Sequence, residues 1–166
     1  MTKTEENLKE AFAGESQANR KYLAFAKKAD EEGKKQIAKL FRAAADAETV
    51  HALNHLRVLG EVGSTEENLK KAINGETEEY EEMYPGMIEQ AEEDDNSEAK
   101  QSFESANKVE EIHANLYKNA KEALDNGEDL EEKDIYVCQT CGNTVEELPA
   151  RCPICGQPKE EFKKIE

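Results

Sequence analysis

The sequence predicts an all-α four-helix bundle followed by a small, metal-bound β/knuckle domain. Long stretches carry apolar residues at steps of three and four, which is the spacing of one helix face. Glutamates interrupt these apolar stripes, and in two cases a histidine follows three residues later. All four cysteines lie between residues 138 and 155 as two CxxC pairs. These patterns predict helices around an inward metal site and a separate thiolate site.

Length and charge narrow the functional classes. The 166 residues suffice for one core and a small appendage. A formal net charge of -16 argues against nucleic acid or an anionic membrane surface as a partner, because both repel a polyanion. The N-terminal residues lack the apolar centre of a signal peptide, and no apolar run approaches the roughly 20 residues of a membrane span. We therefore expect a cytoplasmic protein, and a reducing compartment favours thiolate metal ligands over disulfides.

The first predicted helix runs from Thr4 to Glu32, with Thr4 in a plausible capping sequence and Gly33 directly after the end. Glu15 is the only charged residue on its apolar stripe. It is either an inward metal ligand or a residue at the edge of the stripe. Tyr22 is either a core tyrosine or a hydrogen-bond partner of the site.

The second predicted helix runs from Lys34 to Leu59 and ends at Gly60. Glu48 and His51 lie on its apolar stripe as a Glu-x-x-His motif. His55 also faces inward and is a candidate ligand, although we favour a histidine that supports the ligands or is simply buried.

The third predicted helix spans about Glu76 to Glu93, and residues 66–72 form a possible separate helical turn before it. Pro85 is expected to bend this helix and not to end it, because the apolar pattern continues beyond it. Glu79 and Glu82 are candidate ligands, with a solvated acidic face as the alternative.

The fourth predicted helix follows a polar turn at residues 94–97 and carries Glu110 and His113 on its apolar face. A buried carboxylate costs several kcal/mol unless something compensates its charge, and a neighbouring imidazole does so only in part. A metal ion would compensate it. The two side chains are separated by about 4.5 Å of axial rise, which a divalent cation can bridge.

Each of the four helices thus offers an inward glutamate, and two of them add a histidine. This set matches the ligands of ferritin-like di-iron or di-manganese bundles, in which two helices give one glutamate each and two give Glu-x-x-His. The four glutamates are Glu15, Glu48, Glu79 and Glu110.

The domain organisation follows from composition. We expect the bundle to occupy residues 1–126, an acidic linker residues 127–134, and the cysteine domain residues 135–166. A unit this small needs its metal to fold. Iron would make it a one-electron carrier, whereas zinc would make it purely structural. Its four ligands are Cys138, Cys141, Cys152 and Cys155.

With both halves considered, the chain resembles the rubrerythrins, in which a ferritin-like di-iron bundle precedes a rubredoxin-like domain. The resemblance covers essentially the whole chain. It rests on Ala13-Gly14-Glu15-Ser16-Gln17-Ala18, Glu48-x-x-His51, Glu79-Tyr80-Glu81-Glu82-Met83-Tyr84-Pro85, Glu110-x-x-His113 and the two CxxCG knuckles. It implies that the two irons are ligated in the oxidised state by Glu15, Glu48, Glu79, Glu82, Glu110 and His113. It further implies that one iron exchanges Glu82 for His51 on reduction, which makes these two residues the catalytic pair.

The resemblance also implies a function. The expected reaction is reduction of hydrogen peroxide to water in defence against oxidative stress, with electrons relayed through one iron at the four cysteines. A reduced rubredoxin or a flavoprotein reductase would donate them, and the protein would be a homodimer. Two alternatives stay open: a ferroxidase or iron-storage bundle, and a non-enzymatic interaction module with a structural zinc ribbon. The crossover near residues 60–65 permits a bundle closed within one chain or by helix exchange between two.

Overall fold

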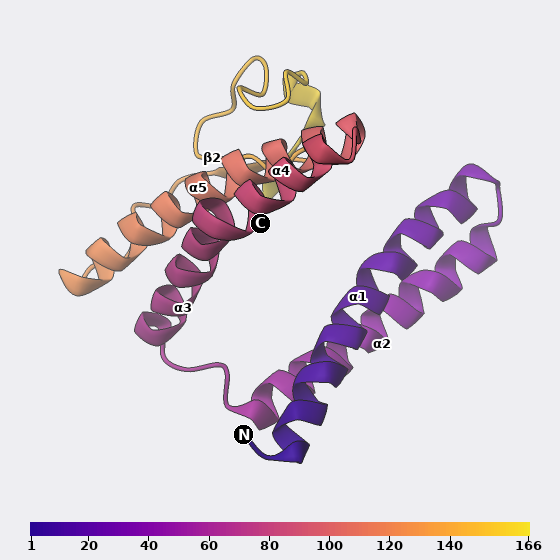
Figure 1. The fold of residues 1–166 in the computed structure, drawn as a ribbon, viewed down its shortest axis with the longest axis horizontal. Helices are drawn as coiled ribbons and strands as arrows, with labels where there is room; N and C mark the ends of the chain where they lie inside the picture. The colour runs from indigo at the N-terminus through magenta and orange to yellow at the C-terminus, as the bar shows by residue number, and fades with distance from the viewer. The chain divides into compact units, whose positions relative to one another are not determined.

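The computed structural model describes residues 1–166 and divides into two units, residues 1–63 and 64–166. The first unit is a hairpin of two helices, α1 (Lys3–Glu31) and α2 (Lys35–Leu59). The second unit holds the remaining helices, α3 (Thr65–Glu78), the π-helical turn η1 (Glu79–Met83), α4 (Tyr84–Glu93) and α5 (Ser97–Asp125). It ends in three short strands (Figure 1). None of the helices combines the length and apolar character that a membrane span requires.

The ends of α1 and α2 follow local side-chain chemistry. Thr2, and not the expected Thr4, caps α1: its hydroxyl accepts a hydrogen bond from Glu5 N at 3.2 Å, and Glu5 Oε2 accepts one from Thr2 N at 2.6 Å. The reciprocal pair is a capping box, which requires a glutamate three residues after the cap. At the same, open end of the hairpin, Gly60 terminates α2 as predicted, with a φ of 68° that glycine adopts without strain.

Alanines pack α1 against α2. The buried residues of the hairpin are Ala26, Ala29, Ala38, Ala45 and Ala52. Small side chains let two helix axes approach closely, and Asn19 Nδ2 fastens them further by donating to Ala45 O at 2.7 Å. Larger apolar side chains stay outside this contact, among them Leu40, which is 69% exposed, and Leu53, which is 59% exposed. The hairpin by itself therefore leaves an apolar face in contact with solvent.

The third long helix begins earlier than the sequence indicated. Residues 66–72 are not a separate helical turn, because α3 runs without interruption from Thr65. Ser64 starts it with a second capping box: its hydroxyl accepts from Glu67 N, and Glu67 Oε2 accepts from Ser64 N at 2.7 Å. Gly75 costs some helix propensity but does not break the helix.

The helix continues through Pro85, as predicted, by way of a π-turn. Proline has no backbone N–H, and its ring clashes with the carbonyl four residues earlier in a regular α-helix. Here η1 widens the turn just before Pro85, and the N–H of Tyr84 bonds to Glu79 O, five residues back. The wider turn relieves the crowding, so α4 follows η1 without a break in the helical backbone.

Helix α5 is the element against which α3, α4 and the cysteine domain pack. Asn96 Oδ1 caps it by accepting from Ala99 N at 3.0 Å, and α3 and α4 pack along it with Val109 and Ala114 buried. Strands β1 (Ile135–Cys138), β2 (Thr144–Val145) and β3 (Phe162–Ile165) form an antiparallel sheet in the order β2-β1-β3. Strand β2 contacts α5, which fixes the cysteine domain against this helix.

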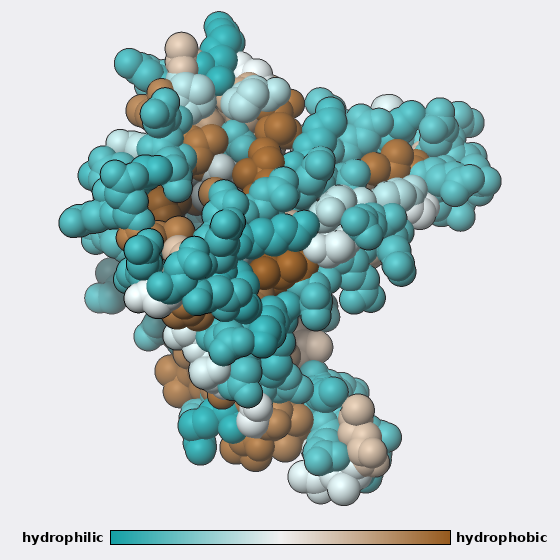
Figure 2. Space-filling model, turned by 90° about the vertical axis from the view of Figure 1, so that its left-hand side faces the viewer, coloured by the Kyte–Doolittle hydropathy of each residue, from teal (hydrophilic) through white to brown (hydrophobic).

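The surface reflects the composition. Figure 2 shows a mostly hydrophilic face on which hydrophobic side chains gather in separate patches. This agrees with a chain in which 36% of residues are charged and the formal net charge is -16.

We predict that Ser64→Ala lowers the free energy of unfolding of the protein by about 1 kcal/mol, because the capping hydroxyl of α3 is lost. Urea denaturation followed by helix circular dichroism measures the change. Ser97→Ala is the matched control, since Asn96 and not Ser97 caps α5. A loss in the control equal to that in Ser64→Ala would contradict the prediction.

Candidate metal centres

The hairpin of α1 and α2 brings together three of the predicted ligands. Glu15 comes from α1, and Glu48 and His51 come from adjacent turns of α2. His51 Nδ1 lies 3.0 Å from Glu48 Oε2 and 3.8 Å from Glu15 Oε1. One ligand atom from each residue lies within 4.8 Å of the other two. Glu15 therefore faces the candidate ligands of α2 and does not lie at the edge of its stripe.

The electrostatics of this first cluster indicate an excess of negative charge. A hydrogen bond with Glu48 raises the pKa of Glu15, and burial raises it further. The hydrogen bond with His51 lowers the pKa of Glu48. A divalent cation held between the two carboxyl groups would compensate their charge and stabilise both as carboxylates.

A second cluster with the same geometry lies in residues 64–166. It consists of Glu76 from α3 and of Glu110 and His113 from α5, again with one ligand atom each within 4.8 Å of the others. His113 Nδ1 lies 2.8 Å from Glu110 Oε2 and 3.8 Å from Glu76 Oε2. Each cluster thus contains two carboxylates and one imidazole, with Nδ1 as the nitrogen that faces the carboxylates.

Glu76 is a member of this cluster that the sequence analysis missed. It precedes Glu79 by three residues and so shares its helix face, and this spacing was the available signal. Burial, followed by the nearby charge of Glu110, raises the pKa of Glu76 to about 7. Glu79 is half-buried beside the cluster, and burial and Glu110 raise its pKa as well. Glu82 is exposed and lies outside the cluster, so the ligand roles of Glu79 and Glu82 stay predictions.

The two other residues singled out in the first helices differ in their surroundings. The Tyr22 ring centroid lies 6.3 Å from those of Phe25 and Phe41, in an aromatic group that favours the packing interpretation. His55 is half-buried and outside the first cluster, although a positive charge on it would lower the pKa of Glu15.

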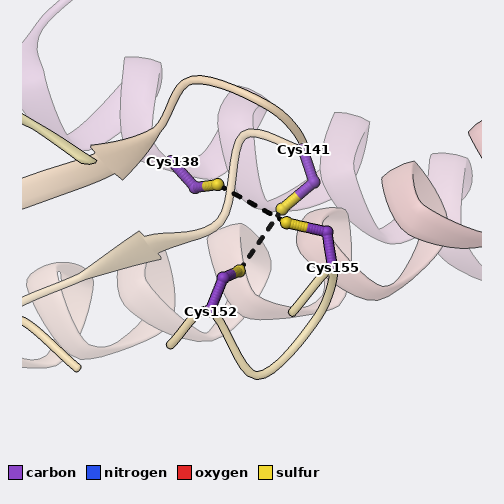
Figure 3. Close-up of side chains that lie close together, drawn as sticks. All are labelled: Cys138, Cys141, Cys152 and Cys155. Carbon is purple, nitrogen blue, oxygen red and sulfur yellow. Dashed lines mark hydrogen bonds between the residues drawn. The ribbon is translucent and has the colours of Figure 1, made fainter. Parts of the chain in front are cut away.

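The four cysteines converge on one point (Figure 3). The Cys138 and Cys155 sulfurs are 3.6 Å apart, as are those of Cys141 and Cys152. Four sulfurs at about 2.3 Å from a central ion would be ~3.8 Å from one another in a tetrahedron, so the observed spacing fits a metal. A glycine with a left-handed backbone follows the second cysteine of each CxxC pair. Gly142 has a φ of 84° and Gly156 a φ of 74°.

Polar groups around one sulfur, that of Cys152, lower the pKa of its thiol. Burial acts to raise the pKa of the Cys152 thiol, but backbone N–H groups of Cys155 and Ile154 outweigh it, and the pKa falls to about 7. The fully buried Asn143 adds a contact from its Nδ2 to Cys152 Sγ at 3.7 Å. Burial raises the pKa of the Cys141 thiol. A bound metal would displace the proton of this thiol.

Comparison with known proteins identifies both halves of the chain. The family model described as rubrerythrin matches residues 6–121. The chain belongs to the rubrerythrin family. A second model, described as the rubrerythrin rubredoxin-like domain, matches residues 136–163. This assignment confirms the predicted fold class, a ferritin-like helical fold with a rubredoxin-like appendage.

Individual rubrerythrins and their relatives match over nearly the whole chain. Rubrerythrin-2 of Clostridium acetobutylicum is 36% identical, with 96% of this chain and 95% of the relative covered. Nigerythrin of Nitratidesulfovibrio vulgaris is 38% identical, with 96% of this chain and 85% of the relative covered. A solved structure of nigerythrin in its fully reduced, all-ferrous state matches with a TM-score of 0.58 and 36% identity, covering 99% of this chain and 88% of that one.

The residues present fit the metals of a rubrerythrin. Carboxylate oxygens and imidazole nitrogens are ligands that iron accepts, and the raised pKa values of Glu15 and Glu76 mark places where positive charge is missing. The sulfur geometry fits a tetrahedral thiolate ion. The chain therefore has the ligands of a di-iron site and of a rubredoxin-like four-cysteine site.

Glu76 gives a pH dependence that can be measured without metal. Its folded-state pKa of about 7 exceeds the ordinary value of 4.5, so the folded protein binds more protons than the unfolded one between these values. Stability of the metal-free protein should therefore rise as the pH falls through this window. Glu76→Gln should flatten the dependence of the melting temperature on pH. Glu78→Gln, at an exposed position on the same helix, should leave the pH dependence of the melting temperature unchanged. Equal flattening in both variants would contradict the attribution of this dependence to Glu76.

Proposed function

We propose that this protein reduces hydrogen peroxide to water in the cytoplasm, with electrons that enter through iron at the four cysteines. The overall reaction consumes two electrons and two protons for each peroxide and yields two molecules of water. The thiolate iron would take its electrons one at a time from a reduced rubredoxin or a flavoprotein reductase.

The observation that carries this proposal is the contact between a carboxylate–histidine cluster and the thiolate domain. His113 Nε2 lies 2.9 Å from Thr144 Oγ1, so a ligand of the second cluster touches the first residue of β2. An iron-storage or ferroxidase bundle has no need of a one-electron carrier. A peroxidase needs one, because its di-iron site must be reduced again after each turnover.

We propose that the ligands of both clusters serve one di-iron site. Glu15, Glu48, Glu76 and Glu110 together carry four negative charges, which two ferrous ions would balance. Glu79 and Glu82 add carboxylates on η1, and π-turns occur often at functional sites. When bound, the two ferrous ions supply both electrons for cleavage of the O–O bond, so that no radical is released. Closure within one chain and helix exchange in a homodimer would provide the same ligands.

Tyr84 is suited to hold peroxide beside these ligands. It is half-buried, and burial together with the charges of Glu110 and Glu79 raises its pKa. The phenol therefore keeps its proton at neutral pH and can donate a hydrogen bond to a peroxide oxygen.

We propose that Glu82 and His51 exchange as ligands when the site changes oxidation state. Both side chains are exposed, and His51, at 54%, is more exposed than the corresponding His113, at 26%. Exposed side chains change rotamer without repacking a core. A carboxylate favours the more highly charged ferric state and a neutral imidazole the ferrous state, so the exchange would match ligand charge to metal charge.

An anaerobic titration tests the peroxidase reaction. The fully reduced protein should regain the colour of its oxidised thiolate iron promptly, near the amount set by two electrons per peroxide. A parallel titration with dioxygen is the control. If the colour returned promptly with dioxygen but slowly with peroxide, the result would favour iron or dioxygen chemistry. A protein without colour would carry zinc at the cysteines.

Glu82→Ala tests the proposed exchange. We expect slow peroxide turnover, on the order of tenfold or more below the parent, with both metal centres still partly occupied. Glu81→Ala is the matched control, because Glu81 lies on the same π-turn. Steady-state peroxide reduction and iron content measure the outcome. Unchanged turnover in Glu82→Ala would remove this residue from the mechanism.

A further inference from the structure

Thr144 lies where the thiolate domain meets α5. It starts β2, two residues after Gly142 and three after Cys141. Its Oγ1 lies 2.9 Å from His113 Nε2 and 3.1 Å from Gly142 O. The same knuckle rests on α5 next to Val109, since a Cβ placed on Gly142 would lie 3.7 Å from Val109 Cγ1. The hydroxyl is thus held between a histidine of the second cluster and the backbone of a cysteine knuckle.

A threonine hydroxyl has one proton to donate and lone pairs to accept with. If that proton goes to Gly142 O, the hydroxyl accepts from His113, and Nε2 must carry the imidazole proton. If the proton goes to Nε2 instead, Nδ1 carries the imidazole proton, and Gly142 O loses this partner in a half-buried loop. Buried carbonyl groups are rarely left without a donor, which favours the first arrangement.

The second cluster favours the same arrangement. Nδ1 is the nitrogen that faces Glu110 and Glu76, so a metal ion bound there would need the Nδ1 lone pair. Only the tautomer with its proton on Nε2 offers that lone pair. In the metal-free protein, Nδ1 and Glu110 Oε2 form a 2.8 Å hydrogen bond whose donor depends on the tautomer, and a metal ion held by both atoms would replace this hydrogen bond.

We propose that Thr144 is a positioning residue that holds His113 in its metal-binding tautomer and joins this ligand by hydrogen bonds to the thiolate knuckle. The connection runs from the His113 ring through Nε2–H and the Thr144 hydroxyl to the Gly142 carbonyl. Gly142 is bonded directly to Cys141. Resting on the proposed function, this connection would link the cysteines that would hold the thiolate iron to His113, and electrons that enter at the cysteines would pass along it toward the second cluster.

Nitrogen NMR of the full chain tests the tautomer without peroxide. The protein is labelled with ¹⁵N-histidine and loaded with zinc, which is diamagnetic and binds both cysteine and histidine ligands. The His113 resonances should show a proton on Nε2 that exchanges slowly with water and a metal on Nδ1. A proton on Nδ1 in the zinc-loaded protein, or Nε2 as the metal ligand, would overturn the proposal.

Substitutions separate positioning from folding. Thr144→Val keeps the β-branched shape for β2 but removes the hydroxyl, and we expect the zinc affinity followed at the His113 resonance to fall by about 10- to 100-fold. Thr144→Ser should restore it. Thr140→Val makes the same chemical change at an exposed position of the same domain and should match the parent. Parent-like affinity in Thr144→Val would overturn the positioning role, and amide spectra of β1 and β2 check that the sheet persists.

The electron connection has its own measurement. In the fully reduced, iron-loaded protein, the return of thiolate-iron colour after peroxide should slow by at least about tenfold in Thr144→Val and be unchanged in Thr140→Val. Recovery at the parent rate in Thr144→Val would overturn the connection. If the parent itself does not react with peroxide, the proposed function fails, while the NMR experiment still decides the role of Thr144.

Discussion

The structure depends on carboxylates that the helices bring together without enough positive charge. Each cluster holds two glutamates and one histidine whose ligand atoms crowd within 4.8 Å. The hydrogen bond with Glu48 raises the pKa of Glu15, and burial followed by the charge of Glu110 raises that of Glu76. These groups are only partly buried, yet crowding like charges is costly unless a positive charge compensates them. The helical part of the chain is therefore a scaffold whose stability and metal content are linked.

The stability of the small C-terminal domain also depends on a bound metal, here held by sulfur atoms. Its sheet has three short strands, and its buried residues are Cys138, Asn143 and Cys152. The small apolar surface buried in this domain cannot offset the entropy lost when more than thirty residues become ordered. The metal must therefore supply much of the folding free energy. Knuckle glycines with positive φ and backbone N–H groups directed at sulfur prepare the site for its ion.

Much of this arrangement could be predicted from spacing, and the misses have physical reasons. Glu-x-x-His on an apolar stripe located Glu48, His51, Glu110 and His113, because helix periodicity is local. The cap of α1 was placed at Thr4, although a capping box needs the glutamate three residues on, which points to Thr2. Glu76 was missed because its pairing with Glu110 depends on how α3 packs on α5. The contact of Thr144 with His113 joins residues 31 positions apart in sequence, and no local pattern reports such a contact.

The π-turn at Glu79–Met83 has a consequence for how this helix tolerates change in length. A π-turn accommodates one residue more than the α-helix on either side of it. Removing a single residue there would restore a regular helix and preserve both flanking segments, yet it would turn Glu79 relative to the side chains beyond by about 100°. Insertions and deletions, which helices usually tolerate poorly, would at this one place change which side chains share a helix face. The position of the extra residue, and not only the identity of the side chains, decides which carboxylates α3 and α4 present on one face.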